Sequence, residues 1–201
     1  MGLFFIYDLP SEIAVCLLAA GWLGFAAILV IGKRGAAEGA ARRDAKSSIG
    51  LALQCIAYAL CFVFHRDFFS PLIRGPFPLG WILASMTMLL TVVSVWFCFA
   101  AARALGKQWA LMARVIEGHE LIREGPYAIV RNPIYLAMLG MLLATGLAVS
   151  VLPAIVAAAA VFFAGTVIRI RSEESLLRAA FGAQFEDYER RTPAFLPFRR
   201  R

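Results

Sequence analysis

Charged residues are scarce in this chain, and their scarcity points to its class. Only 16% of the 201 residues are Asp, Glu, Lys or Arg, whereas 61% are hydrophobic, and the mean hydropathy is +0.76. Soluble domains average roughly 25% charged and 45–50% apolar residues. The composition therefore predicts a membrane protein, and the length predicts a single domain covering residues 1–201.

Charge is absent altogether from four long stretches. They are residues 13–31, 49–64, 75–102 and 132–168, with lengths of 19, 16, 28 and 37 residues. About 20 helical residues cross a hydrocarbon core roughly 30 Å thick, so each of the first three stretches provides one crossing. The fourth is too long for one crossing. It contains Ser150 and Pro153, residue types that suit the start of a new helix.

These stretches predict an all-α, polytopic membrane protein. We expect five transmembrane helices, the last two forming a tight hairpin, followed by a cytoplasmic C-terminal helical tail. The predicted helices cover about residues 11–31, 48–64, 79–103, 133–149 and 151–170, and the predicted tail covers residues 171–201.

Positive charge is nearly missing from one side of this arrangement. Of the 20 Lys and Arg residues, 18 fall after the first helix, between the third and fourth helices, or in the tail, and only Arg66 and Arg74 fall on the other side. The positive-inside rule then predicts an external N-terminus and a cytoplasmic C-terminus. The net charge of +7 would face the headgroups of membrane lipids, not nucleic acid. No protein partner is indicated.

Further absences narrow the possible functions. The four uncharged stretches hold no Asp, Glu, Lys, Arg or His, which disfavours an ion pump or a proton-coupled transporter. The four Cys form no CxxC pair, so neither a metal site nor a disulfide framework is predicted. His119 is a lone histidine in a loop, where a capping or supporting role is expected in place of metal binding.

The polar chemistry that is present gathers in residues 103–135 and 169–201. In "GPYAIVRNPIYLA", residues 125–137, Gly125-Pro126 predicts a turn, and Asn132-Pro133 predicts a capped helix start. The amide groups of that helix end, with Arg131 beside them, could hold a carboxylate or phosphate. Tyr135 lies on the same helical face as Asn132. The alternative is a plain helix start whose Arg and Tyr reach the interface.

The second polar stretch is "RIRSEESLLRAAFGAQFEDYERRTPAFLPFRR", residues 169–200. Glu173 stands four residues after Arg169, which is a pairing distance on a helix. Adjacent helical residues point about 100° apart, so Glu173 and Glu174 should face different partners. We expect Glu173 to pair with Arg169 and Glu174 to face a pocket. The alternative is an ordinary amphipathic helix that stops at Gly182.

Together, "GHELIREGPYAIVRNPIY" and "RIRSEESLL…FEDYERRTPAFLP" resemble the isoprenylcysteine carboxyl methyltransferase and phospholipid methyltransferase family. These are integral membrane enzymes that use S-adenosylmethionine. The resemblance covers residues 103–201, whereas residues 1–102 share only apolar helices. One departure is Asn132, where the family usually has His, which puts a proton-transfer role at that position in doubt. No GxGxxG follows a strand, which disfavours a soluble Rossmann methyltransferase.

The resemblance implies a site at the inner helix ends. Arg131 and Glu174 are the implied catalytic residues, and Tyr188 and Arg191 are implied to bind substrate. The implied cofactor-binding residues are His119, Gly125, Tyr127, Val130, Arg131, Asn132, Tyr135, Glu173 and Glu174.

The expected function is methyl transfer to a polar group on a lipid-like or small apolar acceptor. A carboxylate acceptor is favoured because it needs no base, and no clear base besides the glutamates is found. A phospholipid amine is the alternative acceptor. A non-enzymatic membrane scaffold or assembly subunit is the alternative from a different class.

Overall fold

The computed structural model describes residues 9–35, 45–67, 70–73, 77–106 and 121–197, and regular structure within these ranges is α-helical. The all-α prediction is therefore confirmed. The helices are α1 (Leu9–Gly35), α2 (Ala45–Val63), α3 (Phe77–Leu105), α4 (Pro126–Ile129), α5 (Pro133–Val149), α6 (Leu152–Phe181) and α7 (Ala183–Arg191).

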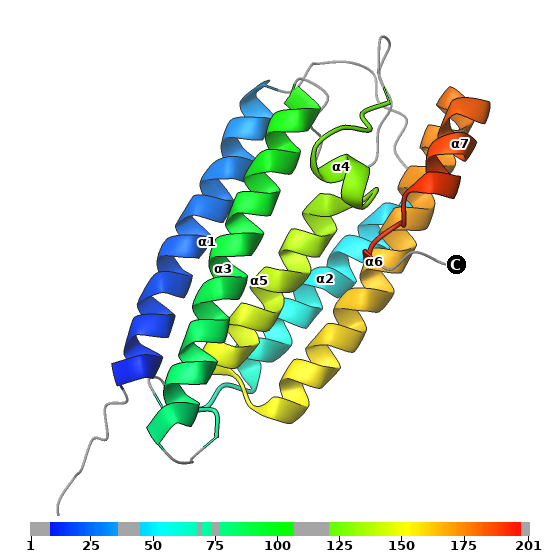
Figure 1. Ribbon diagram of the computed structural model, residues 1–201. Helices are drawn as coiled ribbons and strands as arrows, with labels where there is room; N and C mark the ends of the chain where they lie inside the picture. Colours follow the sequence, from blue (N-terminus) through cyan, green and yellow to red (C-terminus); the bar gives the residue numbers. More distant parts are fainter. Residues whose placement is uncertain (1–8, 36–44, 68–69, 74–76, 107–120, 198–201) are drawn as a thin grey trace, which may run out of the picture.

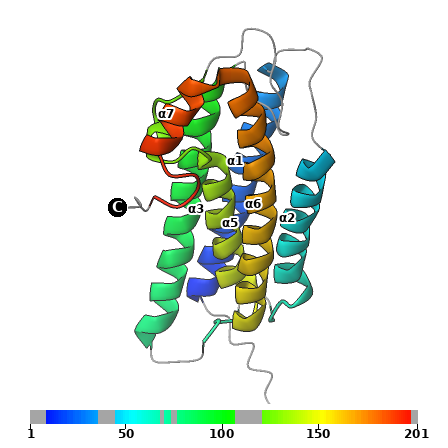
Figure 2. The same ribbon diagram turned by 90° about the vertical axis from the view of Figure 1, so that its right-hand side faces the viewer.

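The five long helices lie side by side with nearly parallel axes, and the two short helices, α4 and α7, lie at one end of this bundle (Figure 1). Helix α2 packs mainly on α6, and α3 packs on both α1 and α5. The quarter-turn view shows α7 folded against the end of α6 (Figure 2). The ends of α3, α5 and α6 therefore meet α4 and α7 in one region, and the described parts of the two polar stretches, residues 121–135 and 169–197, fall at this end of the bundle.

Among the residues that the structure describes, three helices have the length and composition needed to cross a membrane, which indicates a membrane protein. Their apolar spans are Leu9–Gly32, Pro78–Leu105 and Leu152–Phe181, and the other two long helices carry shorter apolar stretches, Ser47–Val63 and Pro133–Val149. Large side chains such as Leu23, Leu89 and Trp96 are exposed on the outer faces of the bundle, as expected for helices surrounded by lipid.

The predicted hairpin between the last two long helices is present, since α5 ends at Val149 and α6 begins at Leu152. Ser150, however, does not cap α6 as expected. It is the C-cap residue of α5, and its hydroxyl donates to the Phe64 carbonyl. The guanidinium of Arg66 instead secures this end, because it donates to the carbonyls of Leu147, Ala148 and Ser150. These are helix-terminal acceptors that would otherwise lack partners.

Helix α6 is longer than predicted. The sequence places its end at residue 170, where charged residues begin, but the helix continues to Phe181 and stops at Gly182, which has φ +49°. The charged residues do not end it because several of them find partners on neighbouring helices. The start of α6 agrees with the prediction, and its stop at Gly182 agrees with the alternative interpretation of the tail as an amphipathic helix. The predicted tail also contains a further helix, α7.

Small residues allow α2 and α6 to approach closely. A Cβ atom added at Gly50 would lie 2.5 Å from Arg169 Cγ and 2.6 Å from the Gly165 carbonyl oxygen. Such close backbone approach is typical of helix pairs in membranes. The α2–α6 contact brings α2 next to the polar end of α6.

Cys61 and Cys98 are free and fully buried, as expected for small apolar packing residues, whereas Cys16 and Cys55 are free but exposed.

Candidate functional site

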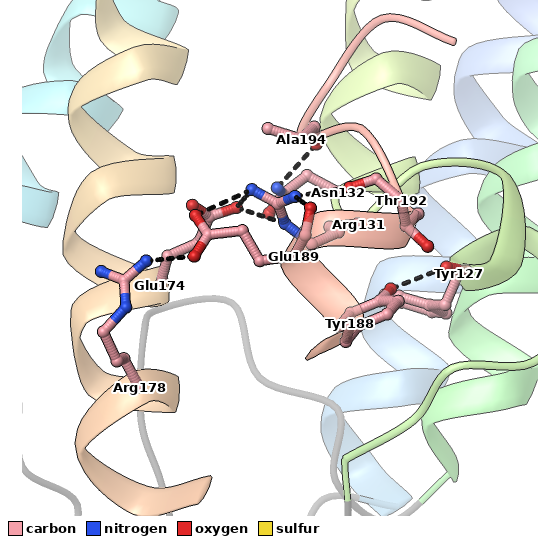
Figure 3. Close-up of polar contacts among 9 residues, drawn as sticks. All are labelled: Tyr127, Arg131, Asn132, Glu174, Arg178, Tyr188, Glu189, Thr192 and Ala194. Atoms are coloured by element: carbon pink, nitrogen blue, oxygen red, sulfur yellow. Dashed lines mark hydrogen bonds and ion pairs between the residues drawn. The ribbon is translucent and has the colours of Figure 1, made fainter. Parts of the chain in front are cut away.

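The entrance of α5 is built as a turn followed by a helix start. Gly125 has φ +59°, a conformation that favours glycine, and it leads into the one-turn helix α4. Asn132 then precedes α5, with Pro133 in the first turn. The Asn132 side chain makes no capping hydrogen bond, so that expectation was wrong. Its amide donates instead to the Ala194 carbonyl at 2.8 Å, which ties α5 to the C-terminal segment (Figure 3).

Arg131 binds the protein through its whole guanidinium group. Its Nε and Nη2 atoms lie 2.8 and 2.7 Å from Glu174 Oε1, and Nη2 also lies 3.5 Å from a carboxylate oxygen of Glu189. Nη1 donates to the backbone carbonyls of Glu189 and Thr192 (Figure 3). The backbone amide of Arg131 donates to Pro193 O at 2.9 Å. In this arrangement the guanidinium faces Glu174, Glu189 and Thr192 of the protein itself.

The two adjacent glutamates face different partners, in agreement with the helical geometry. Glu173 lies 3.7 Å from Arg169, confirming the predicted pair, and it accepts a hydrogen bond from the Tyr135 hydroxyl. Glu174 faces Arg131 on the side of α7. One turn further along α6, Arg178 pairs with Glu189 of α7 (Figure 3). The glutamate pair therefore divides the site into two polar clusters.

The cluster around Glu173 extends to α2 through groups that the sequence reasoning did not select. Arg169 is buried, its Nη1 donates to Gln54 Oε1 at 3.0 Å, and its guanidinium carbon lies 4.9 Å from the centre of the Tyr135 ring. The Gln54 amide nitrogen in turn donates to Thr166 Oγ1 at 2.9 Å. A sequence signal existed, because Gln54 is an amide within an otherwise apolar run, and buried amides commonly bond across membrane helices.

The cluster around Glu174 borders a small cavity of about 80 Å³. Its apolar walls come from α3, α6, α7 and the segment before α4. Its lining residues are Leu105, Leu121, Ile122, Tyr127, Arg131, Asn132, Glu174, Leu177, Phe185 and Tyr188. Five of these, Tyr127, Arg131, Asn132, Glu174 and Tyr188, are residues that the resemblance assigned to the site.

Tyr127 and Tyr188 form the buried aromatic wall of this cavity. The Tyr188 hydroxyl donates to the Tyr127 carbonyl at 2.6 Å, which fastens α7 to α4 (Figure 3). Burial raises the pKa of both phenols above their ordinary value of 10.0. Both side chains are therefore neutral hydrogen-bonding groups at physiological pH.

The other predicted site residues are placed differently. Tyr135 and Glu173 belong to the cluster that faces α2 and are not in the cavity lining. Val130 is fully buried as a packing residue. The side chain of Arg191 is 75% exposed and pairs with Asp187, so the structure does not bring it to the cavity. His119 lies outside the described residues.

The fold and the site define a helical membrane protein with a polar pocket at one end of its bundle. Residues 83–184 match the phospholipid methyltransferase family, which is just over half of the chain, and the chain belongs to that family. The matched region includes the Arg131 motif and both glutamates but ends before Tyr188. Methyltransferase chemistry is therefore what its family implies.

Two curated proteins are similar to part of the chain. The cobalt-zinc-cadmium resistance protein CzcN of Cupriavidus metallidurans is 34% identical over 94 residues, which is 46% of this chain and 43% of that protein. The nickel-cobalt-cadmium resistance protein NccN of Alcaligenes xylosoxydans xylosoxydans is 38% identical over 96 residues, which is 46% of this chain and 44% of that protein. The aligned region thus spans less than half of either relative.

Proposed function

We propose that this chain transfers a methyl group from S-adenosylmethionine to a polar group on a lipid-like or small apolar acceptor at the cytoplasmic membrane face. Family membership supports methyl transfer. The observation that carries the proposal is the convergence of Tyr127, Arg131, Asn132, Glu174 and Tyr188 on one cavity, from three separate parts of the sequence. A carboxylate acceptor is favoured, and a phospholipid amine is the alternative.

The cavity residues suit this cofactor in their chemistry. The Glu174 carboxylate is complementary to a sulfonium or an ammonium group, the Asn132 amide and the phenols can form hydrogen bonds, and Leu105, Leu177 and Phe185 suit a flat purine. The volume of about 80 Å³ is smaller than the roughly 300 Å³ at which ligand pockets begin. Cofactor binding thus requires the cavity walls to lie further apart than they do here.

Each cavity residue then has a definite task. When bound, the cofactor supplies a methyl group on a sulfonium. Glu174 would place negative charge beside that cation, and Arg131 would orient Glu174 and not the ligand. The apolar walls and Tyr127 would exclude water, and positioning would provide most of the rate. A carboxylate acceptor needs no base, so the protein need not move a proton.

All five long helices are proposed to cross the membrane, with α2 and α5 as short crossings. The charge asymmetry of the sequence and the three long apolar spans support this arrangement. The cavity would then open at the cytoplasmic ends of α3, α5 and α6, where a water-soluble cofactor and a membrane-embedded acceptor can meet.

Binding of S-adenosylhomocysteine to the detergent-solubilised protein tests the proposal directly. A rise in melting temperature with this compound, and a measurable dissociation constant by calorimetry, are expected. A membrane scaffold should show neither. Methyl transfer is then tested with labelled S-adenosylmethionine and a lipid extract, followed by mass spectrometry for a product heavier by one methyl group. Carboxylate and amine acceptors are distinguished by the alkali lability of a methyl ester.

Glu174→Gln tests the role of the pocket carboxylate, and Glu173→Gln, one residue away, is the variant with which it is compared. Removing the charge of Glu174 should weaken binding of S-adenosylmethionine, which carries the sulfonium, tenfold or more, about 1.4 kcal/mol, while keeping the shape of the side chain. Glu173→Gln should have a smaller effect on affinity and lower the melting temperature. Unchanged affinity in Glu174→Gln would remove the glutamate pair from the proposed site.

A further inference from the structure

The cluster on the α2 side of Glu173 forms a continuous chain of polar contacts across three helices. Tyr135 on α5 donates to Glu173 on α6, which pairs with Arg169. Arg169 donates to Gln54 on α2. These contacts lie among apolar residues, where each bond is stronger than in water and each missing partner costs more.

Gln54 is placed to fix Arg169 in one position. The Gln54 side chain is 1% exposed, and its oxygen and nitrogen are both used, by Arg169 and Thr166 respectively. Close packing of α2 on α6 at Gly50 prevents the aliphatic part of Arg169 from moving toward α2. Arg169 therefore has a fixed stem and a fixed acceptor, and its charge is held beside Glu173 and over the Tyr135 ring.

The orientation of Glu173 affects the cavity because the next residue, Glu174, lines the cavity. Glu173 and Glu174 are consecutive residues of one helix and point about 100° apart. The hydrogen bond from Tyr135 of α5 to Glu173 couples the rotation of α6 about its axis to the position of α5. That rotation determines where Glu174 lies relative to Arg131 and Asn132 in the cavity wall.

We propose that Gln54 is a positioning residue for the cofactor pocket: by holding Arg169 it fixes Glu173 and thereby sets the rotation of α6 that turns Glu174 into the cavity. This inference rests on the proposed function. It extends the site to α2, which lies outside the residues matched to the family. Gln54 itself touches neither cofactor nor acceptor in this account.

The test compares two substitutions that affect the two ends of the Gln54 amide. Gln54→Met keeps a straight side chain but removes the acceptor for Arg169, and Thr166→Val removes only the partner of the amide nitrogen. Both lose the Gln54–Thr166 hydrogen bond, so both should lower the melting temperature of the full-length protein in detergent. Only Gln54→Met should weaken S-adenosylhomocysteine binding, by about fivefold, whereas Thr166→Val should stay within about twofold of wild type.

A double-mutant cycle separates positioning from general destabilisation. Glu173→Gln alone should also weaken binding about fivefold, and Gln54→Met combined with Glu173→Gln should weaken it about fivefold again, not about twenty-fivefold, because both act through the same contacts. Arg169→Lys provides a second route if Gln54→Met does not fold. Lysine cannot bond Gln54 and Glu173 together as the guanidinium does, so affinity should again fall about fivefold.

Three outcomes overturn the inference, and the third differs from the first two because it also overturns the proposed function. Wild-type protein that binds S-adenosylhomocysteine, with Gln54→Met or Arg169→Lys binding within twofold of it, shows that Gln54 is only a packing residue. Additive losses in the double variant show the same. Wild-type protein that fails to bind S-adenosylhomocysteine overturns the proposed function, and this inference with it.

Discussion

Arg131 joins the entrance of α5 to α6 and to the C-terminal segment. Its guanidinium joins Glu174 of α6 to the backbone carbonyls of Glu189 and Thr192, and its amide reaches Pro193. Its side chain is only 7% exposed and that of Glu174 is 13% exposed. A buried charge of this kind is strongly destabilising when its partner is removed. Arg131 therefore acts first on the structure of the site.

Arg131→Ala should lower the free energy of unfolding by about 3 kcal/mol, because it leaves the Glu174 carboxylate and several carbonyls without their donor. Arg178→Ala is the matched control. Arg178 also pairs with a glutamate at this end of α6, but its side chain is 46% exposed and screened by solvent, so a much smaller loss is expected. Denaturant titrations of both variants in detergent measure the difference. Equal losses would mean that the Arg131 contacts are not maintained in solution.

At the scale of single elements, α6 organises the molecule through two opposite surfaces. One packs on α2 through Gly165 and carries Arg169 and Glu173, and the other carries Glu174 and Arg178 toward α7. Helix α6 therefore depends on close packing against α2 and on polar contacts with α7. These two contacts can be tested separately.

Gly50→Ala tests the close fit. Its added methyl group would overlap Arg169 Cγ and the Gly165 carbonyl oxygen, and backbone at such a contact can move little. A loss of about 1–3 kcal/mol is expected from overpacking, despite the higher helix propensity of alanine. At Gly24 the nearest atom, Val95 Cγ1, would be 3.6 Å from the new Cβ, so Gly24→Ala should be neutral or slightly stabilising. Equal effects on thermal unfolding would contradict the α2–α6 contact.

Tyr188→Phe tests the fit of α7. Loss of the hydrogen bond to the Tyr127 carbonyl should cost about 1 kcal/mol at pH 8. Burial raises the pKa of Tyr188, so the phenol ionises more readily in the unfolded chain, and its contribution to stability is full below pH 10 and declines above it. The variant should therefore lose less stability than wild type between pH 8 and pH 11. Parallel pH profiles of the melting temperature would show that Tyr188 is not buried in solution.

The sequence predicted those features that follow from local rules. Uncharged runs located the long helices, Gly182 was identified as a helix stop in the alternative interpretation of the tail, and the i, i+4 spacing gave the Arg169–Glu173 pair. The errors came from partners that are distant in sequence. Asn132 bonds Ala194 in place of its own helix, and Arg131 is occupied by residues about 60 positions away. Helix α6 was predicted too short because Gln54 and Glu189, which stabilise its charged end, could not be placed beside it from sequence alone.

At the scale of the whole molecule, orientation in the membrane decides whether the proposed activity is possible. The 18-to-2 distribution of Lys and Arg predicts that the cavity faces the cytoplasm, where S-adenosylmethionine is made available. Reporter fusions after residue 70 should behave as external, and fusions after residues 40, 118 and 201 should behave as cytoplasmic. Replacing Lys33 and Arg34 by Gln is a control that should leave this orientation unchanged, because most of the positive charge remains on the same side. An external fusion at residue 201 would place the cavity of Glu174 away from its cofactor, and methyl transfer from S-adenosylmethionine could not then be the function of this site.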